Sequence, residues 1–146
     1  MKILIINGPN LNLLGRREPE IYGSTSFEDY LKELKTVFPQ HSIDYYQSNH
    51  EGCIIDKLQE AWGLYDGIVI NPGGYAHTSI AIADCIRAIT TPVVEVHISD
   101  IYQREEYRHH SYTGEACLTM ITGQGLKGYE IAINKLIDNQ LQQTTL

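Results

Sequence analysis

The sequence lacks the features that mark nucleic-acid-binding, secreted and membrane proteins. Its 146 residues contain 11 Lys and Arg against 18 Asp and Glu, a net charge of −7, without any basic run. We expect no nucleic-acid partner, because nothing would neutralise the phosphates. No apolar run approaches the roughly 20 residues of a membrane span, and no small-residue cleavage site follows Met1. These absences predict a cytoplasmic chain with neither a membrane partner nor a signal peptide.

The cysteines lack the spacing of a metal or redox site. Cys53, Cys85 and Cys117 are well separated, odd in number and set among apolar residues, with no CxxC pair. We therefore predict buried, reduced thiols, as in a cytosolic protein. Phenylalanine is scarce too, with 2 residues against 10 tyrosines. This ratio favours aromatic surfaces with one polar end, as at interfaces or binding sites.

Strands and helices are predicted to alternate along the chain. Apolar or alternating segments predict strands over residues 2–7, 42–47, 67–71, 93–97 and 118–122. Apolar residues at helical spacing predict helices over residues 25–38, 52–64, 79–89 and 129–141. Thr25 and Glu28 match a capping box, and Pro39 ends the first helix. Trp62 belongs to the expected buried stripe of the second helix, and residues 142–146 are expected to fray.

This alternation predicts one α/β domain over residues 1–146, a three-layer sandwich with a five-stranded parallel sheet. The simplest strand order is flavodoxin-like, 2-1-3-4-5, and ligands then bind outside the carboxyl ends of the strands. Three unusual segments leave those ends, over residues 7–10, 71–77 and 97–99. We expect them to converge at one edge of the sheet and form a site there.

The loop after the first strand, GPNLNLLGRREPEIYG, has the periodicity of neither a helix nor a strand. A loop this long in a small domain is usually functional or disordered, and its apolar residues argue against disorder. Its Tyr22 has Arg16 and Arg17 nearby, and a guanidinium group lowers the pKa of a tyrosine, which makes it a better base. Alternatively, Tyr22 only anchors the loop, with Arg17 stacked on its ring. The residues alone slightly favour this second interpretation.

The segment NPGGYAHTS, residues 71–79, leaves the third predicted strand and enters a helix. Gly73, Gly74 and Thr78 suit a tight turn with a helix cap. A turn needs neither Asn71 nor His77, so these two are candidate binding residues. The segment contains no GK[ST] or GxGxxG phosphate motif.

Glu95 and His97 fall on one face of the fourth predicted strand, because side chains alternate along a strand. A buried carboxylate is costly without a partner, so we expect the two to pair. The pair is either a structural ion pair or an acid with its orienting carboxylate. A metal site that adds His77 is a weaker alternative, because no compact motif such as HExxH is present.

Arg104 and Arg108 are spaced i, i+4 and would share one face of a helix. They could contact an anionic or polyhydroxy ligand near His97, or they could pair with Glu105 and Glu106. The sequence favours neither interpretation. His109 and His110 are expected to lie at the surface.

Together, GPNLNLLGRREPEIYG, NPGGYAHTS and EVHISDIYQREEYRHHSY resemble the type II 3-dehydroquinate dehydratases, in matching order over essentially the whole chain. The resemblance implies a flavodoxin-like fold and a homo-oligomer, a dodecamer built as a tetramer of trimers. It implies no cofactor and no metal. The reaction would be reversible dehydration of 3-dehydroquinate to 3-dehydroshikimate in the shikimate pathway, an anti elimination through an enolate.

The resemblance also implies a role for each matching residue. Tyr22 would be the base at C2, with Arg17 favouring its phenolate. His97 would be the acid for the C1 hydroxyl, oriented by Glu95, and Asn10 would hold a water at the enolate oxygen. Substrate would be bound by Asn71 and the backbone N–H groups of Ile98 and Ser99 at its carboxylate, His77 and Arg108 at its ring hydroxyls, and Asp84 from a neighbouring subunit.

The chain departs from the family pattern at Asp100, where many members have Asn. The resemblance also implies that the loop over residues 17–22 closes as a lid over substrate. Two rival functions are a flavodoxin-like binding or signalling module without catalysis and a metal-dependent hydrolase. A biosynthetic role and a catabolic role in quinate breakdown would use the same residues.

Overall fold

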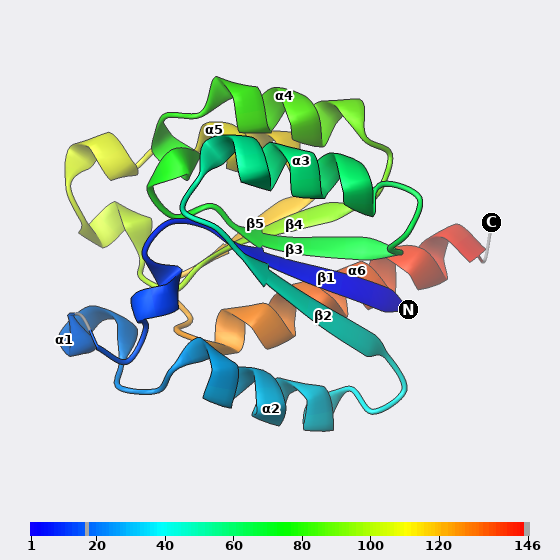
Figure 1. Ribbon diagram of the computed structural model, residues 1–146, viewed down its shortest axis with the longest axis horizontal. Helices are drawn as coiled ribbons and strands as arrows, with labels where there is room; N and C mark the ends of the chain where they lie inside the picture. The colour runs from blue at the N-terminus through cyan, green and yellow to red at the C-terminus, as the bar shows by residue number, and fades with distance from the viewer. Residues whose placement is uncertain (17, 145–146) are drawn as a thin grey trace.

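Figure 1 shows the chain as a computed structural model, which describes residues 1–16 and 18–144 apart from the side chains of Ile21 and Tyr22. Within these residues one parallel sheet has the order β2-β1-β3-β4-β5. Its strands are β1 (Lys2–Asn7), β2 (Ser42–Gln47), β3 (Gly67–Asn71), β4 (Val93–His97) and β5 (Thr119–Thr122). The predicted fold class and strand order are confirmed.

Helices cover both faces of the sheet. One face carries α2 (Phe27–Val37) and α6 (Lys127–Thr144), and the other carries α3 (Glu51–Ala61), α4 (Ile80–Ala88) and α5 (Tyr112–Ala116) (Figure 1). Shorter elements connect them: η1 (Leu11–Leu13), α1 (Pro19–Tyr22), η2 (Gly73–His77), η3 (Ile101–Gln103) and η4 (Glu106–Arg108). These short elements gather where the strands end, so that edge of the sheet is built from loops.

The sheet separates two hydrophobic clusters. Ile3 and Ile5 of β1 pack on the α2–α6 side with Phe27. Leu4 and Ile6 face the α3–α4 side. The alternation follows from the two-residue period of a strand, and it explains why β1 is apolar throughout. Parallel strands covered on both faces hold the loop-built edge in place.

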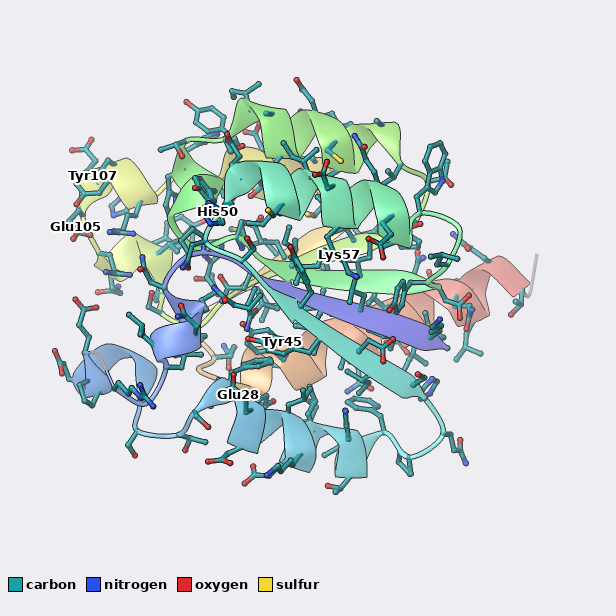
Figure 2. The ribbon with its side chains drawn as sticks, in the orientation of Figure 1. Glu28, Tyr45, His50, Lys57, Glu105 and Tyr107 are labelled. Atoms are coloured by element: carbon teal, nitrogen blue, oxygen red, sulfur yellow. The ribbon has the colours of Figure 1, made fainter. Side chains whose placement is uncertain are left out.

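Side chains drawn in Figure 2 follow this division. Tyr45 leaves β2 on the α2 side, where its ring stacks on Phe27 with centroids 4.6 Å apart, and Lys57 lies on the α3 side. Glu105 and Tyr107 stand at the end of the molecule where the carboxyl ends of the strands lie. The charged run that contains them is therefore part of the loop-built edge.

The start of α2 differs by one residue from the prediction. Ser26, not Thr25, is the N-cap, because its Oγ accepts a hydrogen bond from the Asp29 N–H at 3.2 Å. The two hydroxyl residues are adjacent, and both have an acidic residue three positions later. Sequence spacing alone could not separate them.

The prediction for Trp62 was wrong, and the bounds of the closing helix differ from the predicted ones. Trp62 ends α3 and is 51% exposed instead of buried; its Nε1–H donates to Thr90 Oγ1 at 2.9 Å. The closing helix α6 runs from Lys127 to Thr144, so it begins earlier and ends later than predicted; the fraying of residues 142–146 stays a prediction. Residues 145–146 of the predicted frayed end lie outside the described part of the chain.

The cysteines are free thiols, as predicted, but they are not all buried. Cys85 is buried and Cys117 half-buried, whereas Cys53 is exposed on α3. Burial raises the pKa of the Cys85 and Cys117 thiols, which makes both unreactive. No helix in residues 1–16 and 18–144 combines the length and the hydropathy needed to cross a membrane.

Candidate active site

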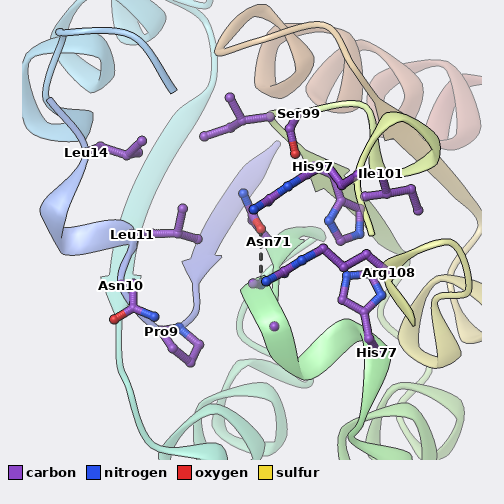
Figure 3. A pocket seen from close by; sticks show the side chains of 14 residues that line it. Pro9, Asn10, Leu11, Leu14, Asn71, His77, His97, Ser99, Ile101 and Arg108 are labelled. Carbon is purple, nitrogen blue, oxygen red and sulfur yellow. Dashed lines mark hydrogen bonds between the residues drawn. The ribbon is translucent and has the colours of Figure 1, made fainter. Parts of the chain in front are cut away.

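A cavity of about 150 Å³ opens at the carboxyl ends of the strands. Figure 3 shows Asn10 and Leu11 on one side of it, His77, His97 and Arg108 on the other, and Asn71 between them. Its described lining residues are Pro9, Asn10, Leu11, Leu14, Asn71, Gly73, Gly74, His77, His97, Ile98, Ser99, Ile101, Arg104 and Arg108. The three segments predicted to converge thus do so, at the switch point between β1 and β3.

The most deeply buried charged group of the site is the Glu95 carboxylate behind His97. Its Oε2 lies 2.7 Å from His97 Nε2 and accepts a hydrogen bond from Ser111 Oγ at 2.5 Å. Thr113 Oγ1 donates to the other oxygen, Oε1. Glu95 is 0% exposed and His97 6% exposed. Three donors therefore satisfy a carboxylate that burial would otherwise make costly.

This arrangement determines which ring nitrogen of His97 can react. With Nε2–H donating to Glu95, Nδ1 is the nitrogen left for a ligand in the cavity. The carboxylate stabilises a positive charge on the ring, so His97 can release or accept a proton at Nδ1. Sequence analysis predicted the pair but missed the two hydroxyls, because Ser and Thr near a helix start usually signal only a cap.

His77 is arranged as a neutral acceptor. Its Nδ1–H donates to the His110 backbone oxygen at 2.8 Å, so Nε2 carries the lone pair. Burial lowers the pKa of His77 from its usual 6.5, which keeps the ring uncharged near neutral pH. Its ring stacks on that of His97 with centroids 5.9 Å apart. A lone pair at this place suits a ligand hydroxyl.

The Asn71 carboxamide is held at both of its polar atoms. Its Oδ1 accepts a hydrogen bond from the Gly73 N–H at 3.2 Å, the dashed line in Figure 3. Its Nδ2 donates to the hydroxyl of Tyr129 at 3.0 Å, and that hydroxyl donates to Asn7 Oδ1 at 2.8 Å. Sequence analysis missed Tyr129 as part of the site, because it lies 58 residues after Asn71.

The other side of the cavity is formed by Pro9, Asn10, Leu11 and Leu14 of the first loop, the segment from residue 8 to residue 25. Asn10 has a left-handed backbone with φ 70°, which Asn tolerates better than most residues. Its N–H donates to Asn49 Oδ1 at 3.0 Å, and Gln47 Nε2 donates to the same oxygen at 3.1 Å. Gly8 must lack a side chain, because a Cβ there would lie 2.5 Å from the Pro72 carbonyl oxygen. This part of the first loop is therefore anchored to its neighbours.

The two arginines of the charged run do not share a helix face. Arg104 is extended between η3 and η4, which is the physical reason that the i, i+4 prediction was wrong. Both nevertheless line the cavity, and Arg108 Nε also donates to Glu105 Oε2 at 2.7 Å. The Glu105 backbone N–H, and then Arg108, hold the pKa of the Glu105 carboxyl below its usual range. The pairing with Glu105 is thus observed for both arginines, and their contact with a ligand stays a prediction.

Three predicted site residues are not brought together by the described structure. Arg17 lies outside the described residues, and so does the side chain of Tyr22, whose backbone ends α1. Asp84 is exposed on α4, 3.8 Å from Arg87, and does not line this cavity. The assignments of the base, its arginine and the neighbouring-subunit carboxylate remain predictions.

The alternative of a metal site finds no ligand set among residues 1–16 and 18–144. No three His, Cys, Asp or Glu side chains in that part of the chain are grouped so that they could hold an ion. Glu95 is instead occupied by His97 and two hydroxyls, and His77 Nδ1 by a carbonyl oxygen. The described side chains of the site are thus joined by hydrogen bonds to one another and to the backbone.

Comparisons with known proteins point to one family. The family model described as dehydroquinase class II matches residues 1–137. The chain is 51% identical over 146 residues to the 3-dehydroquinate dehydratase of Clostridium botulinum strain Langeland, across 99% of this chain and 96% of that protein. It is 47% identical over 146 residues to the catabolic 3-dehydroquinase of Aspergillus clavatus, across 99% and 97%. The crystal structure of type II dehydroquinase from Butyrivibrio crossotus DSM 2876 superposes with a TM-score of 0.88 at 51% identity, covering 93% of this chain and 97% of that one.

Proposed function

The chain belongs to the class II dehydroquinase family, and we propose that it catalyses the reversible dehydration of 3-dehydroquinate to 3-dehydroshikimate. Loss of water next to a carbonyl needs a base for the proton, an acid for the leaving hydroxyl and a stabiliser for the enolate oxygen. The observation that carries the proposal is the buried Glu95–His97 pair. The two side chains are 2.7 Å apart, and His97 lines the cavity at the carboxyl ends of the strands.

His97 is the proposed acid. Its Nδ1 gives a proton to the C1 hydroxyl as the C–O bond breaks, and Glu95 stabilises the positive ring before the transfer. Ser111 and Thr113 keep the carboxylate in place through their hydrogen bonds. This support means that the acid needs no rearrangement when substrate arrives.

Tyr22 is the proposed base, with Arg17 favouring its phenolate. Support comes from the family and from the position of α1, which lies at the carboxyl end of the sheet (Figure 1). In an anti elimination the proton leaves one face of the ring and the hydroxyl the other. Residues of the first loop and of β4 line opposite sides of the cavity. A base carried by that loop and an acid on β4 would therefore suit this stereochemistry.

The remaining lining residues are proposed to bind substrate. Asn10 holds the water at the enolate oxygen, while Asn71 and the backbone N–H groups of Ile98 and Ser99 take the carboxylate. The carbonyl oxygens of Ile98 and Ser99 accept hydrogen bonds from the turn after β5, at 3.0 and 3.1 Å, which fixes this backbone. His77 and Arg108 contact the ring hydroxyls, and Arg108 adds positive charge in a chain of net charge −7.

The assembly follows from the family resemblance. We propose a cytoplasmic homo-oligomer, a dodecamer, in which residues 1–146 form one catalytic domain and Asp84 reaches the site of a neighbouring subunit. Asp84 is exposed on α4, as a residue with this role must be in a single protomer. The enzyme then serves the shikimate pathway.

The proposed reaction is tested by mixing the purified protein with 3-dehydroquinate and following the ultraviolet absorbance of the conjugated product. A strong chelator in the assay tests the metal alternative at the same time. We expect turnover that the chelator does not change. A folded protein that forms no product would contradict the proposed function, and activity lost to the chelator would favour a metal enzyme.

A further inference from the structure

A buried phenol bridges two strand ends beneath the cavity. Tyr129, in the first turn of α6, is 0% exposed. Its hydroxyl lies between Asn7 Oδ1, at 2.8 Å, and Asn71 Nδ2, at 3.0 Å. Asn7 and Asn71 are register partners at the carboxyl ends of β1 and β3. The hydroxyl therefore joins the two strands at the switch point where the ligand site lies.

The hydrogen-bond inventory of this chain determines the orientation of the Asn71 amide. The hydroxyl has one proton, and Asn7 Oδ1 takes it, so towards Asn71 it can only accept. The Asn71 oxygen accepts from the Gly73 N–H. If the Asn71 amide were flipped, its NH₂ group would face the Gly73 N–H, and two donors would meet. Its oxygen would face the Tyr129 hydroxyl oxygen, whose proton is already donated to Asn7. One amide orientation is thus compatible with all three partners.

The phenol is suited to this role at every working pH. Burial raises the pKa of Tyr129 far above its usual 10, so the hydroxyl keeps its proton. Tyr129 uses one of the two hydrogens on Asn71 Nδ2, which leaves the other for a ligand in the cavity that Asn71 lines.

We propose that Tyr129 is a positioning residue, which holds the Asn71 carboxamide in the orientation that binds substrate. The proposal rests on the proposed function, because the ligand is 3-dehydroquinate. Asn71 is a binding group that contacts substrate in the ground state and the transition state alike. Loss of its orientation should then raise KM and leave kcat nearly unchanged.

The surroundings of Tyr129 make a clean variant possible. Its ring packs edge-on against Phe27 with centroids 4.9 Å apart, and beside Tyr30 at 6.2 Å. Tyr129→Phe keeps this aromatic packing and removes only the hydroxyl. Tyr30→Phe is the matched control, because it removes a phenol oxygen from the same cluster without touching Asn7 or Asn71.

The test is a double-mutant cycle in steady-state kinetics with 3-dehydroquinate. Tyr129→Phe should raise KM by about five- to ten-fold, the loss of one hydrogen bond, with kcat within about two-fold. In an Asn71→Ala background the same change should have no further effect on KM, because the residue acts through Asn71. Tyr30→Phe should match the wild type in both constants.

Other results would overturn the proposal. A Tyr129→Phe protein with wild-type KM but a lower melting temperature would make the hydroxyl purely structural. An equal rise in KM with and without Asn71 would mean that Tyr129 acts by another route. If Tyr129→Phe does not fold, Asn7→Ala removes the acceptor of the hydroxyl and should also raise KM; an unchanged KM would contradict the proposal. A wild-type protein without turnover would instead overturn the proposed function, and this inference with it.

Discussion

The two sides of the cavity differ in how deeply their polar side chains are buried. On the β3–β4 side, Asn71, Glu95 and His97 are 3%, 0% and 6% exposed. Asn71 and Glu95 form hydrogen bonds with other elements, and His97 is held by Glu95. In the first loop, most described side chains between Asn12 and Thr25 are exposed. One side is built like a protein core and the other like a surface loop.

This difference in burial leads us to expect the acid on the buried side and the base on the exposed loop. Buried, fully hydrogen-bonded groups can keep one geometry through a reaction cycle, which suits an acid and the groups that bind substrate. Segments with few buried contacts open at a low free-energy cost. We therefore expect substrate to enter past the first loop and the base to arrive with that loop.

Tyr22→Phe should have the largest effect, because it removes the proposed base from the first-loop side. We expect kcat to fall by about 10³-fold or more with KM changed little, since the β3–β4 side still binds substrate. Initial rates from product absorbance measure this. Tyr102→Phe, at an exposed tyrosine of η3 that does not line the cavity, is the control and should keep wild-type rates. A wild-type kcat in Tyr22→Phe would contradict the assignment of the base to Tyr22.

Glu95→Gln should have the next largest effect, because it replaces the carboxylate that contacts His97 with a neutral group of nearly the same size. We expect kcat to fall by about 10²-fold at neutral pH, within the range of general acid catalysis. Glu115→Gln neutralises an exposed carboxylate on α5 and should leave the rate unchanged. Equal rates in Glu95→Gln and the wild type would mean that the Glu95–His97 pair is only a structural ion pair.

Gly114→Ala should disturb the same side through packing. A Cβ at this position would lie 3.0 Å from Ser111 Oγ and 3.1 Å from Glu95 Oε2. We expect a loss of about 1–3 kcal/mol in the free energy of unfolding and a several-fold lower kcat. Denaturant titration and kinetics on one preparation measure both. Gly52→Ala, which meets nothing within 4 Å on α3, should instead stabilise by about 0.5–1 kcal/mol with unchanged kcat.

The smallest expected effect is a loss of stability at alkaline pH. Burial raises the pKa of Tyr30 and Tyr45 to about 12, above the 10 of an unfolded chain. The unfolded state therefore loses protons first, so the free energy of unfolding falls as pH rises through this window. Denaturant unfolding at about pH 8 and about pH 11 measures the slope. Tyr30→Phe should flatten it and Tyr107→Phe, at an exposed ring, should not; equal slopes in both would contradict this cause.

The sequence predicted the frame of the molecule because local patterns determine it. Apolar and alternating segments predicted all five strands, and the simplest arrangement of alternating strands and helices predicted their order. Side-chain alternation predicted that Glu95 and His97 would pair. Errors arose where two local solutions were equally good, as at Thr25 and Ser26, or where a helix ended early, as before Trp62.

The supporting groups of the site could not be predicted, because they come from distant parts of the chain. Tyr129 follows Asn71 by 58 residues, Asn49 follows Asn10 by 39, and Ser111 follows Glu95 by 16. None of these side chains belongs to a periodic pattern or a motif with one meaning. Their roles follow only from the packing of the helices and loops on the sheet.

The central claim is that Glu95 and His97 form a preset acid while the first loop supplies the base. The most direct test is kcat with 3-dehydroquinate in the wild type, in Glu95→Gln, in Tyr22→Phe and in the double variant. The acid and the base act on the same elimination, so each single variant should lower kcat strongly. The loss in the double variant should be smaller than the sum of the two single losses in activation free energy. A wild-type kcat in either single variant would contradict the claim.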